Sequence, residues 1–386
     1  MFRTGSFAKS GALLTVEEMI DLTTEMRQGL ETELLAATLT ASDKVLSCAI
    51  LNLLIQWSHL PCNTLVASGV ALILSASVWV LTWIVNRIAR LPISLAEAGL
   101  LMIPALLAGI ALLIVKVLHD VILPPNRAHI AKLPAEQEGF DALRNWFKRS
   151  FDLRRQIVFS VVVGLLAVFT IRVLSTNFPV VRDNIGIHIG VFLGMFAVGN
   201  GGYCALVIPT LASAASKHRM NLYPYDPASS VGVRMASSSF GKLSLANGLV
   251  ASVIIALLFA LHPWEAQSTL IVAFAWLLGG WGAVTYSFVF PHYRVATAIS
   301  REKQIQLEKL ESVIQSYHTR IGDLSAEDLD KLQKMIKLRD EVHKTSNWAI
   351  DAGTWREYIS SLILPLLSFV VGVVDLPTVL RTLLSS

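Results

Sequence analysis

Seven runs of nearly uninterrupted apolar residues follow one another along the chain, separated by polar segments. A helix needs about 20 apolar residues to cross the roughly 30 Å hydrocarbon layer of a bilayer, and each run approaches or exceeds that length. The pattern therefore predicts an all-α polytopic integral membrane protein with about seven transmembrane helices in contact with a lipid bilayer. The predicted spans cover residues 64–85, 95–118, 157–174, 185–212, 243–261, 270–290 and 358–374.

The overall composition also indicates a membrane protein rather than a soluble domain. Hydrophobic residues make up 54% of the 386-residue chain and charged residues only 16%, and the mean hydropathy is +0.58. Such values lie outside the usual range for soluble globular domains. Acidic residues such as Glu17 and Glu18 precede the first run, so no cationic signal peptide is expected. The three cysteines, Cys48, Cys62 and Cys204, are too scattered to predict a disulfide framework or a metal site.

Residues 1–62 are predicted to form a cytoplasmic N-terminal region with amphipathic helices. Thr15 to Glu18 matches a capping box, and apolar residues then recur every three to five positions to about Leu35. We expect this helix to lie on the membrane or on another cytoplasmic helix. The uncharged segment 45–57 is short for a span and Pro61 follows it, which favours an interfacial or re-entrant segment. The alternative, an eighth span, would place the N-terminus outside.

The distribution of basic residues predicts the orientation of the spans. The segments that follow the second and the fourth span are rich in Lys and Arg, whereas the turn 262–267 has neither. Because basic residues gather on the cytoplasmic side, alternation puts the N-terminus in the cytoplasm and the C-terminus outside, in a plasma (inner) membrane. Arg87 and Arg90, between the first two spans, then face outward against the rule. This distribution also explains the net charge of +4 without nucleic acid as a partner.

Residues 63–290 then form a domain of six spans, residues 291–356 a cytoplasmic helical hairpin, and residues 357–386 the last span and a tail. The hairpin is predicted because two helical patterns flank the turn signal 322–325, with Ser325 to Asp328 capping the second helix. Each helix has a narrow apolar stripe. The favoured interpretation is that the two stripes pack on each other, and the alternative adds hairpins of neighbouring subunits in a homo-oligomer. The residues predicted for assembly are Ile305, Leu310, Ile314, Leu332 and Ile336.

The fourth predicted span combines two glycine clusters. Gly186, Gly190 and Gly194 are spaced four apart, which lines them along one face and predicts close contact with a neighbouring helix. The second cluster is Gly199, Asn200, Gly201, Gly202 and Tyr203. It would permit a bend or a local break near mid-membrane, and broken helices occur where backbone lines a cavity or a substrate site. The alternative is that Asn200 bonds a neighbouring span and that these glycines also serve packing.

The fifth and sixth predicted spans hold further residues of the same kinds. Asn247 in the fifth span has the same two interpretations as Asn200. Gly279, Gly280 and Gly282 in the sixth span predict a close-packed or flexible element that is a natural partner for the fourth span. Four arginines, by contrast, are predicted at the outer ends of spans, where they would form a basic rim that favours anions if the protein conducts ions. They are Arg87, Arg90, Arg172 and Arg182.

No pattern in the sequence predicts enzymatic chemistry. G-x-S-x-G, H-E-x-x-H, Walker A and G-x-G-x-x-G motifs are absent, and neither a cofactor nor a metal is expected. The segments 226–232 and 347–367 resemble uncharacterised bacterial polytopic membrane proteins, which implies a bacterial membrane but no activity. The first hypothesis is an oligomeric channel or channel-like transport protein, with a lean to anions. The alternative is a non-conducting membrane sensor or scaffold whose cytoplasmic hairpin binds a protein partner.

Overall fold

Five helices among the described residues are long and apolar enough to cross a membrane. The computed structural model describes residues 16–45, 131–174, 184–261, 266–319 and 325–374, together with separate positions between 73 and 88. The five helices are α6 (Leu153–Leu174), α8 (Ile185–Val207), α10 (Val231–Leu261), α11 (Ala266–His318) and α13 (Ala352–Val374). The protein is therefore an all-α integral membrane protein, with five described spans and not seven. The spans predicted at 64–85 and 95–118 lie mostly or wholly outside the described residues.

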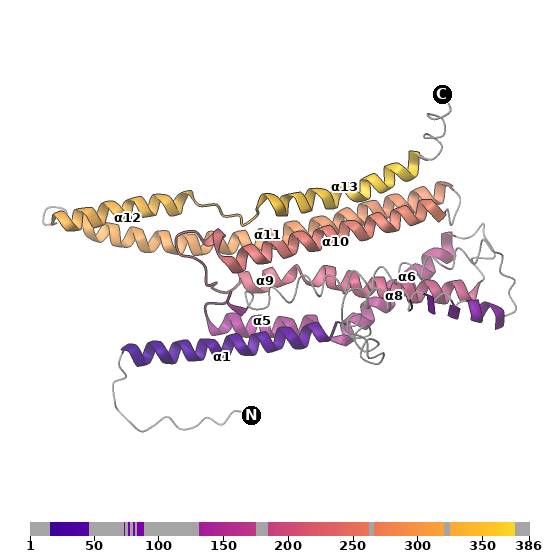
Figure 1. Ribbon diagram of the computed structural model, residues 1–386, viewed down its shortest axis with the longest axis horizontal. Coiled ribbons are helices and arrows are strands. Elements are labelled where there is room, and N and C mark those ends of the chain that lie inside the picture. The colour runs from indigo at the N-terminus through magenta and orange to yellow at the C-terminus, as the bar shows by residue number, and fades with distance from the viewer. Residues whose placement is uncertain are drawn as a thin grey trace, which may run out of the picture.

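The remaining described elements are shorter or more polar helices. They are α1 (Val16–Asp43), α5 (Gln137–Ser150), α9 (Thr210–Ser216), α12 (Ala326–Lys344) and the 3₁₀ turn η1 (Pro227–Ser229). In the described part of the chain the only extended pairing is a single bridge between Pro134 and Met220. Nearly all helices run along one long axis, with α12 at one end and the C-terminal end of α13 toward the other (Figure 1).

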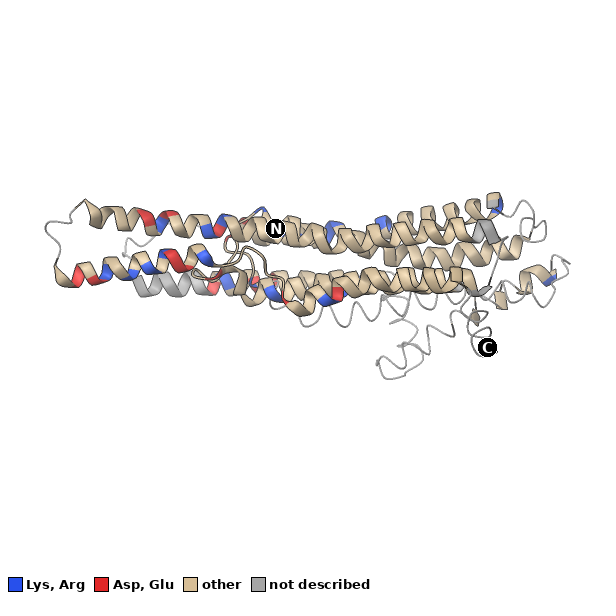
Figure 2. Ribbon diagram, turned by 90° about the horizontal axis from the view of Figure 1, so that it is seen from above, with Lys and Arg blue, Asp and Glu red and all other residues tan. Residues whose placement is uncertain are grey.

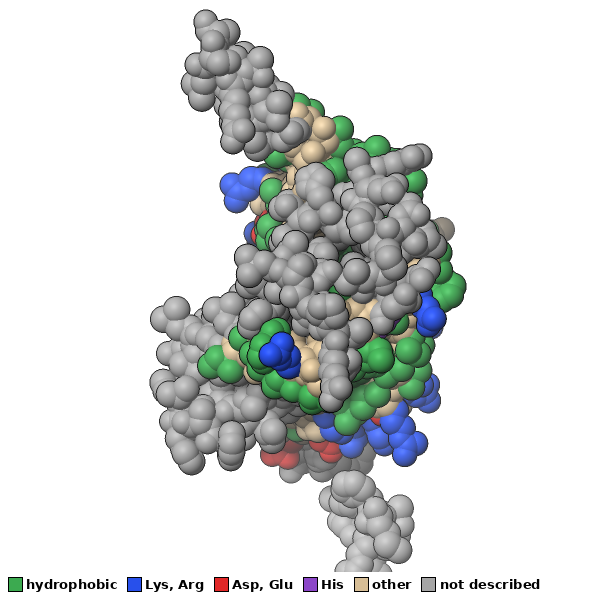
Figure 3. All heavy atoms as spheres, turned by 90° about the vertical axis from the view of Figure 1, so that its right-hand side faces the viewer, with side chains coloured by type: hydrophobic (Ala, Val, Ile, Leu, Met, Phe, Trp, Pro, Cys, Tyr) green, Lys and Arg blue, Asp and Glu red, His purple; other side chains and the backbone are tan. Residues whose placement is uncertain are grey.

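Charge separates the molecule into two halves along this axis. Lys, Arg, Asp and Glu gather over the half that holds α12, whereas the described helices of the other half are almost free of them (Figure 2). Seen from the end opposite α12, the described side chains are largely hydrophobic (Figure 3). We call these the polar half and the apolar half. An outward-facing hydrophobic surface is stable only when lipid or another apolar surface covers it, so the apolar half is the part that contacts the bilayer.

Helices α10, α11 and α13 form one bundle. Positions 241, 248 and 259 of α10 lie against positions 357, 361 and 372 of α13 in that order, so these two helices run in the same direction. Helix α11 runs the opposite way, because Ser237 of α10 contacts His292 of α11, whereas Ala251, later in α10, lies against Gly280, earlier in α11. The Ser244 hydroxyl lies 3.1 Å from the Ser361 hydroxyl of α13 and donates to the Val284 carbonyl of α11. One side chain thus joins all three helices.

Two prolines lie inside the helices of this bundle without ending them. Pro291 in α11 and Pro365 in α13 each lack an N–H group, so a carbonyl one turn earlier loses its helical partner. For Pro365 this is the Ser361 carbonyl, and the carbonyl of the next residue, Leu362, accepts from the Trp281 indole of α11 at 2.9 Å. Contacts with neighbouring helices of this kind help a membrane helix to tolerate proline.

The α6–α8 pair forms a second bundle with antiparallel helices. A Cβ atom at Gly199 of α8 would lie 2.9 Å from the Ser160 Cα of α6, and one at Gly164 of α6 would lie 2.8 Å from the Phe192 ring. Such short separations mean that the two backbones can approach only because glycine has no side chain. Ile187 and Val191 of α8 then pack against Val168 and neighbouring residues of α6.

Helix α1 packs on α5 in the polar half. Leu34 of α1 is buried with Phe140, Leu143 and Phe147 of α5, and Glu33 pairs with Arg144 at 3.0 Å. The N-terminal amphipathic helix thus lies on another helix, which is one of the two predicted placements. It ends at Asp43 rather than near Leu35. The segment 45–57 lies outside the described residues except for its first position.

The predicted hairpin is built from α12 and the second half of α11. Helix α11 continues through Pro291 as a single helix of 53 residues, so no helix ends at the boundary drawn at 291. Ile314 and Leu332 are buried between the two arms, while Ile305, Leu310 and Ile336 are half-buried. Ser325 caps α12, because its hydroxyl accepts from the Asp328 N–H at 3.2 Å. Lys303 closes the base by donating to the carbonyls of His343 and Thr345, each at 2.8 Å.

Asp351 caps the start of α13, and we expect its contribution to stability to depend on pH. Its carboxylate accepts from the Thr354 N–H at 2.7 Å. This backbone hydrogen bond, together with the Thr354 hydroxyl and the positive charge of Arg234, holds the pKa of Asp351 below its ordinary value. Because the folded pKa is lowered, the stabilisation is present at neutral pH and is lost as pH falls from about 4 through the folded pKa.

Substitution of Asp351 by alanine should lower the free energy of unfolding by about 1 kcal/mol at neutral pH. The melting temperature of the detergent-solubilised protein, followed by tryptophan fluorescence, measures this change. The difference between the parent and the D351A variant should shrink as the pH falls below about 4. A difference that stays constant across this range would contradict the capping role.

Candidate functional site

A cavity of about 340 Å³ lies between the two bundles in the apolar half. Helices α6 and α8 form one side, and α10 and α11 form the other. Its walls are apolar side chains and glycine backbone, apart from the Asn247 amide. The lining residues are Phe159, Val163, Met195, Val198, Gly199, Gly201, Gly202, Ala205, Leu206, Asn247, Val250, Ala251, Trp276, Gly279, Gly280 and Ala283. Its volume is within the range of small-molecule pockets, roughly 300–1,000 Å³.

Several residues that were predicted from the sequence come together at this cavity. Gly199, Gly201 and Gly202 of α8 face Asn247 of α10 and Gly279 and Gly280 of α11. These residues come from the fourth, fifth and sixth predicted spans, and the fourth and sixth were expected to be partners. Gly279 leaves the volume of a side chain empty, because a Cβ atom there would meet no described atom within 4 Å, whereas Gly199 and Gly280 let neighbouring helices pack closely. The lack of a side chain at Gly279 therefore contributes to the space between the bundles.

The glycines of α11 differ in what surrounds them. A Cβ atom at Gly280 would lie 2.5 Å from the Ala251 Cβ of α10, so this glycine permits close packing. A Cβ atom at Gly279 or Gly282 would meet no described atom within 4 Å. No described residue of the chain lies against Gly279 or Gly282, so close packing at these two positions stays a prediction. Gly279 forms cavity wall, and Gly282 is exposed.

Asn200 and Tyr203 point into the protein rather than into the cavity. The Asn200 amide is 1% exposed and donates to Gln156 of α6 at 3.0 Å. The Gln156 amide in turn donates to the Lys44 carbonyl at 3.0 Å, and the Tyr203 hydroxyl donates to the Ser150 carbonyl at 2.7 Å. Because Gln156 lies in the first turn of α6, Asn200 contacts the N-terminal end of α6.

The predicted helix break at the second glycine cluster does not occur. Helix α8 is continuous from Ile185 to Val207 and includes Gly199 to Tyr203. Intrahelical hydrogen bonds are favoured in an apolar environment whatever the residues, so glycine alone does not interrupt the helix. The interruption comes at Ile208 and Pro209, between α8 and α9. There the Thr210 hydroxyl donates to the Val207 carbonyl at 2.7 Å, and the Tyr286 hydroxyl of α11 donates to the Leu206 carbonyl at 3.2 Å.

The first glycine cluster lies on the buried face of α8. Gly186, Gly190 and Gly194 are all buried. A Cβ atom at Gly186 would collide with the Asn86 side chain, whose amide oxygen accepts from the Gly186 N–H at 3.2 Å. Asn184 caps the same terminus by accepting from the Ile187 N–H at 3.1 Å. Two asparagines thus satisfy the first N–H groups of α8.

Two of the four arginines predicted for a basic rim are described. Arg172 near the end of α6 and Arg87 beside Asn86 are both exposed at the end of the apolar half farthest from α12. Arg90 and Arg182 lie outside the described residues.

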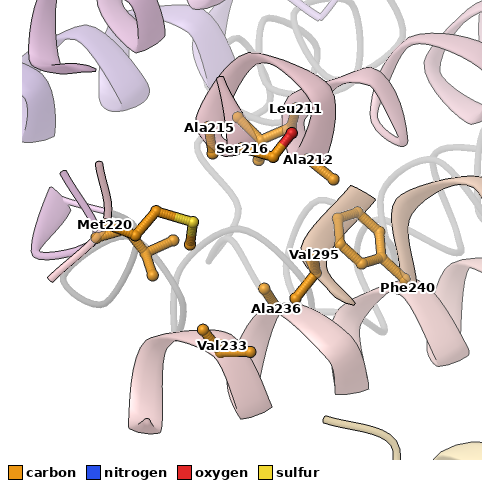
Figure 4. Close-up of a pocket in the computed structure, with 10 residues that line it drawn as sticks. Leu211, Ala212, Ala215, Ser216, Met220, Val233, Ala236, Phe240 and Val295 are labelled. Carbon is orange, nitrogen blue, oxygen red and sulfur yellow. The ribbon is translucent and has the colours of Figure 1, made fainter. Parts of the chain in front are cut away.

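A smaller cavity in the polar half offers no room for a ligand. It lies where α9, α10 and α11 meet, and Figure 4 shows Met220, Phe240 and Val295 among its lining side chains. Its volume is about 30 Å³, close to the volume of one water molecule in the liquid, and its walls are mostly apolar. It is best understood as a packing void in a core of small side chains.

A buried histidine next to this core was not predicted from the sequence. His292 follows Pro291 in α11 and is 4% exposed. Its Nε2 lies 2.8 Å from the Ser237 hydroxyl of α10, and its Nδ1 lies 2.6 Å from the Phe288 carbonyl. Ser237 is also buried, and neither residue lines a cavity described above. The pair joins α10 to α11 where the apolar half meets the polar half.

Comparison with protein families, curated proteins and solved structures finds no match for this chain. Among the described residues no group of three or more His, Cys, Asp or Glu side chains could hold a metal ion. The apolar half and its five spans define the class: an α-helical integral membrane protein with an apolar cavity between two helix bundles.

Proposed function

We propose that the protein is a membrane sensor or scaffold whose α11–α12 hairpin binds a protein partner, with a second copy of the hairpin as the first candidate. One observation carries this proposal: α11 is a single helix of 53 residues, about 80 Å long at 1.5 Å per residue. The same helix lines the cavity at Gly279 and Gly280, and its C-terminal part is one arm of the hairpin. Because a continuous helix is stiff, a displacement of its cavity end also moves its hairpin end.

The contacts along α11 support a rigid connection between the cavity and the hairpin. Beyond the apolar half, the Arg301 guanidinium donates to the His218 carbonyl at 2.5 Å, which ties α11 to the turn after α9. The buried Glu302 carboxylate lies 3.9 Å from both Arg219 and Arg301. Together with the Lys303 bonds at the hairpin base, these contacts fix the direction in which the hairpin projects.

The surface of the hairpin supports its role as a binding element. Its inner stripe is occupied by Ile314, Leu332 and Val342, which are buried. Val313 on α11 and Leu329 on α12 are 41% and 47% exposed, so an apolar surface is left after the arms have packed. The ion pairs of α12, such as Lys334 with Asp330, are exposed and contribute little to the stability of the hairpin.

Removing the exposed apolar side chains should weaken association without unfolding the hairpin. We expect the double variant V313D/L329D to be smaller than the parent in detergent, as measured by light scattering coupled to size-exclusion chromatography. Its helix content should match the parent by circular dichroism, because both positions are exposed. The control L332D introduces a charge at a buried site and should disturb the hairpin itself. A double variant that keeps the parent mass would contradict self-association through this surface.

A channel or channel-like transport protein is the second candidate function. The cavity favours it, because Gly199, Gly201, Gly202 and Asn247 were predicted for a pathway and line one space between α8 and α10. Exposed Arg87 and Arg172 at one end would favour anions. In liposomes that contain the purified protein, chloride flux should exceed the flux in empty liposomes and should fall in the variant N247L. Equal flux with and without protein would exclude this candidate.

The orientation of the protein in the membrane is also part of this proposal. We place the hairpin and α1 in the cytoplasm and the C-terminus outside a plasma (inner) membrane, because basic residues are concentrated in the polar half.

A further inference from the structure

The cavity has the length and chemistry of a hydrocarbon chain. Along α8 its lining extends from Met195 to Leu206, which corresponds to about 16 Å at 1.5 Å per residue. Across from α8, Trp276 to Ala283 of α11 form the wall. A space with mostly apolar walls favours a hydrocarbon chain over water.

The cavity opens to the surface of the apolar half. Leu206 lines it and is 44% exposed, and Gly279 on the opposite wall is also exposed. Both residues belong to helices that are long and apolar enough to cross a membrane. In a bilayer the surroundings of such an opening are lipid, so the apolar molecule that is present at high concentration there is the phospholipid itself.

A positive charge lies at the polar end of the cavity. Arg155 is in the first turn of α6, and the lining residues Phe159 and Val163 follow it after four and eight residues. Because residues spaced by four share a helix face, Arg155 lies on the same face of α6 as these two residues. Arg155 is exposed and lies within electrostatic range of Tyr203, whose neighbour Gly202 also lines the cavity. A guanidinium binds phosphate through paired N–H groups.

We propose that this cavity binds one acyl chain of an anionic phospholipid, with the phosphate of its head group at Arg155. The chain lies between the lining residues Gly201 and Gly202 of α8 and Gly279 of α11, where a Cβ atom at Gly279 would meet no described atom within 4 Å. The head group then lies at the boundary between the apolar and the polar half, where a phosphate remains hydrated. This site does not depend on the function of the hairpin, because it requires only the cavity and Arg155.

The experiment uses the full chain in phosphatidylcholine vesicles that contain a phosphatidylglycerol with a photoactivatable acyl chain. After illumination, mass spectrometry of peptides locates the lipid adducts. We expect adducts to concentrate on the lining residues Phe159, Met195 and Leu206. Substitution of Gly279 by leucine should reduce these adducts to background, because the new side chain enters the cavity. A Cβ atom at Gly279 would meet no described atom within 4 Å.

Matched variants separate this site from general contact with lipid. A Cβ atom at Gly282 of α11 would also meet no described atom within 4 Å, but Gly282 does not line the cavity. The variant G282L should therefore give the same lipid adducts as the parent. The variant R155Q should reduce phosphatidylglycerol adducts about tenfold, as the loss of a charge-assisted hydrogen bond predicts, whereas R154Q should not. A photoactivatable phosphatidylcholine should respond less to R155Q.

Three outcomes would overturn the proposal. Adducts spread evenly over the lipid-facing residues would mean that the cavity is not a site. Equal labelling in G279L and the parent would mean that the chain lies elsewhere. Disulfide cross-links between a cysteine at Leu206 and cysteines placed in residues 64–118, or in a second copy, would assign the space to protein instead of lipid.

Discussion

Replacing Gly248 by leucine is expected to prevent α10 and α13 from packing and to abolish the folded protein. A Cβ atom at this position would lie 2.8 Å from the Ser361 Cα and 2.9 Å from its carbonyl carbon, and closer still to its carbonyl oxygen. These atoms are backbone, and α13 is held there by Ser244 and Trp281, so the helix cannot move aside without losing both hydrogen bonds. Even alanine should cost about 1–3 kcal/mol by overpacking.

The yield of monodisperse protein in size-exclusion chromatography, detected by fluorescence, measures this effect. The matched control is again G282L, because a Cβ atom at Gly282 would meet no described atom within 4 Å. The control should express like the parent and can gain up to about 1 kcal/mol from helix propensity. If G248L and G282L gave equal yields, the contact between α10 and α13 would not be as close as the structure has it.

Gly248 also shows what sequence reasoning could have found. Ser244, Gly248 and Ser252 are spaced four apart, which is the same small-residue pattern that drew attention to Gly186, Gly190 and Gly194. The serines hid the pattern, because they were not counted as small residues. The Ser252 hydroxyl donates to the Gly248 carbonyl at 2.7 Å, so it is satisfied within α10 and behaves as a small side chain.

The rotation of membrane helices is the part of the fold that the sequence predicts least. In a soluble helix the buried face is apolar and the exposed face is polar, so periodicity reveals both. In a span both faces are apolar, because lipid covers the outer one. Gly279 and Gly280 are neighbours in one apolar run, yet one lies against α10 and the other leaves a space. Only the three-dimensional arrangement separates their roles.

The start of α12 was predicted well because polar chemistry marks it, whereas the end of the helix that contains the sixth predicted span was not. Ser325 caps α12 as expected, because its hydroxyl accepts from the Asp328 N–H and donates to the Asp328 carboxylate. The sixth predicted span ends at residue 290, but α11 continues through Pro291. A single lost hydrogen bond does not end a long helix that packs on α10 and α13 along this stretch.

The second large expected effect comes from removing the hydrogen bond between Asn200 and Gln156. It tests whether Asn200 bonds a neighbouring span or has a role in a pathway. Substitution of Gln156 by leucine should lower the free energy of unfolding by about 2–3 kcal/mol, because it removes hydrogen bonds to three partners. These partners are the Asn200 amide and the Lys44 and Phe151 carbonyls. Substitution of Asn200 by leucine should cost less, about 1–2 kcal/mol, because fewer groups lose a partner.

A double-mutant cycle tests whether the two residues act through each other. If they do, the variant Q156L/N200L should be barely less stable than Q156L alone, since the hydrogen bond between Asn200 and Gln156 is already lost in Q156L. Thermal unfolding in detergent gives the three differences from the parent. A pathway role for Asn200 predicts the opposite: N200L would melt like the parent, the two substitutions would be additive, and only the flux in liposomes would change. Coupled losses of stability with unaltered lipid labelling at the cavity would assign Asn200 to the contact between α6 and α8.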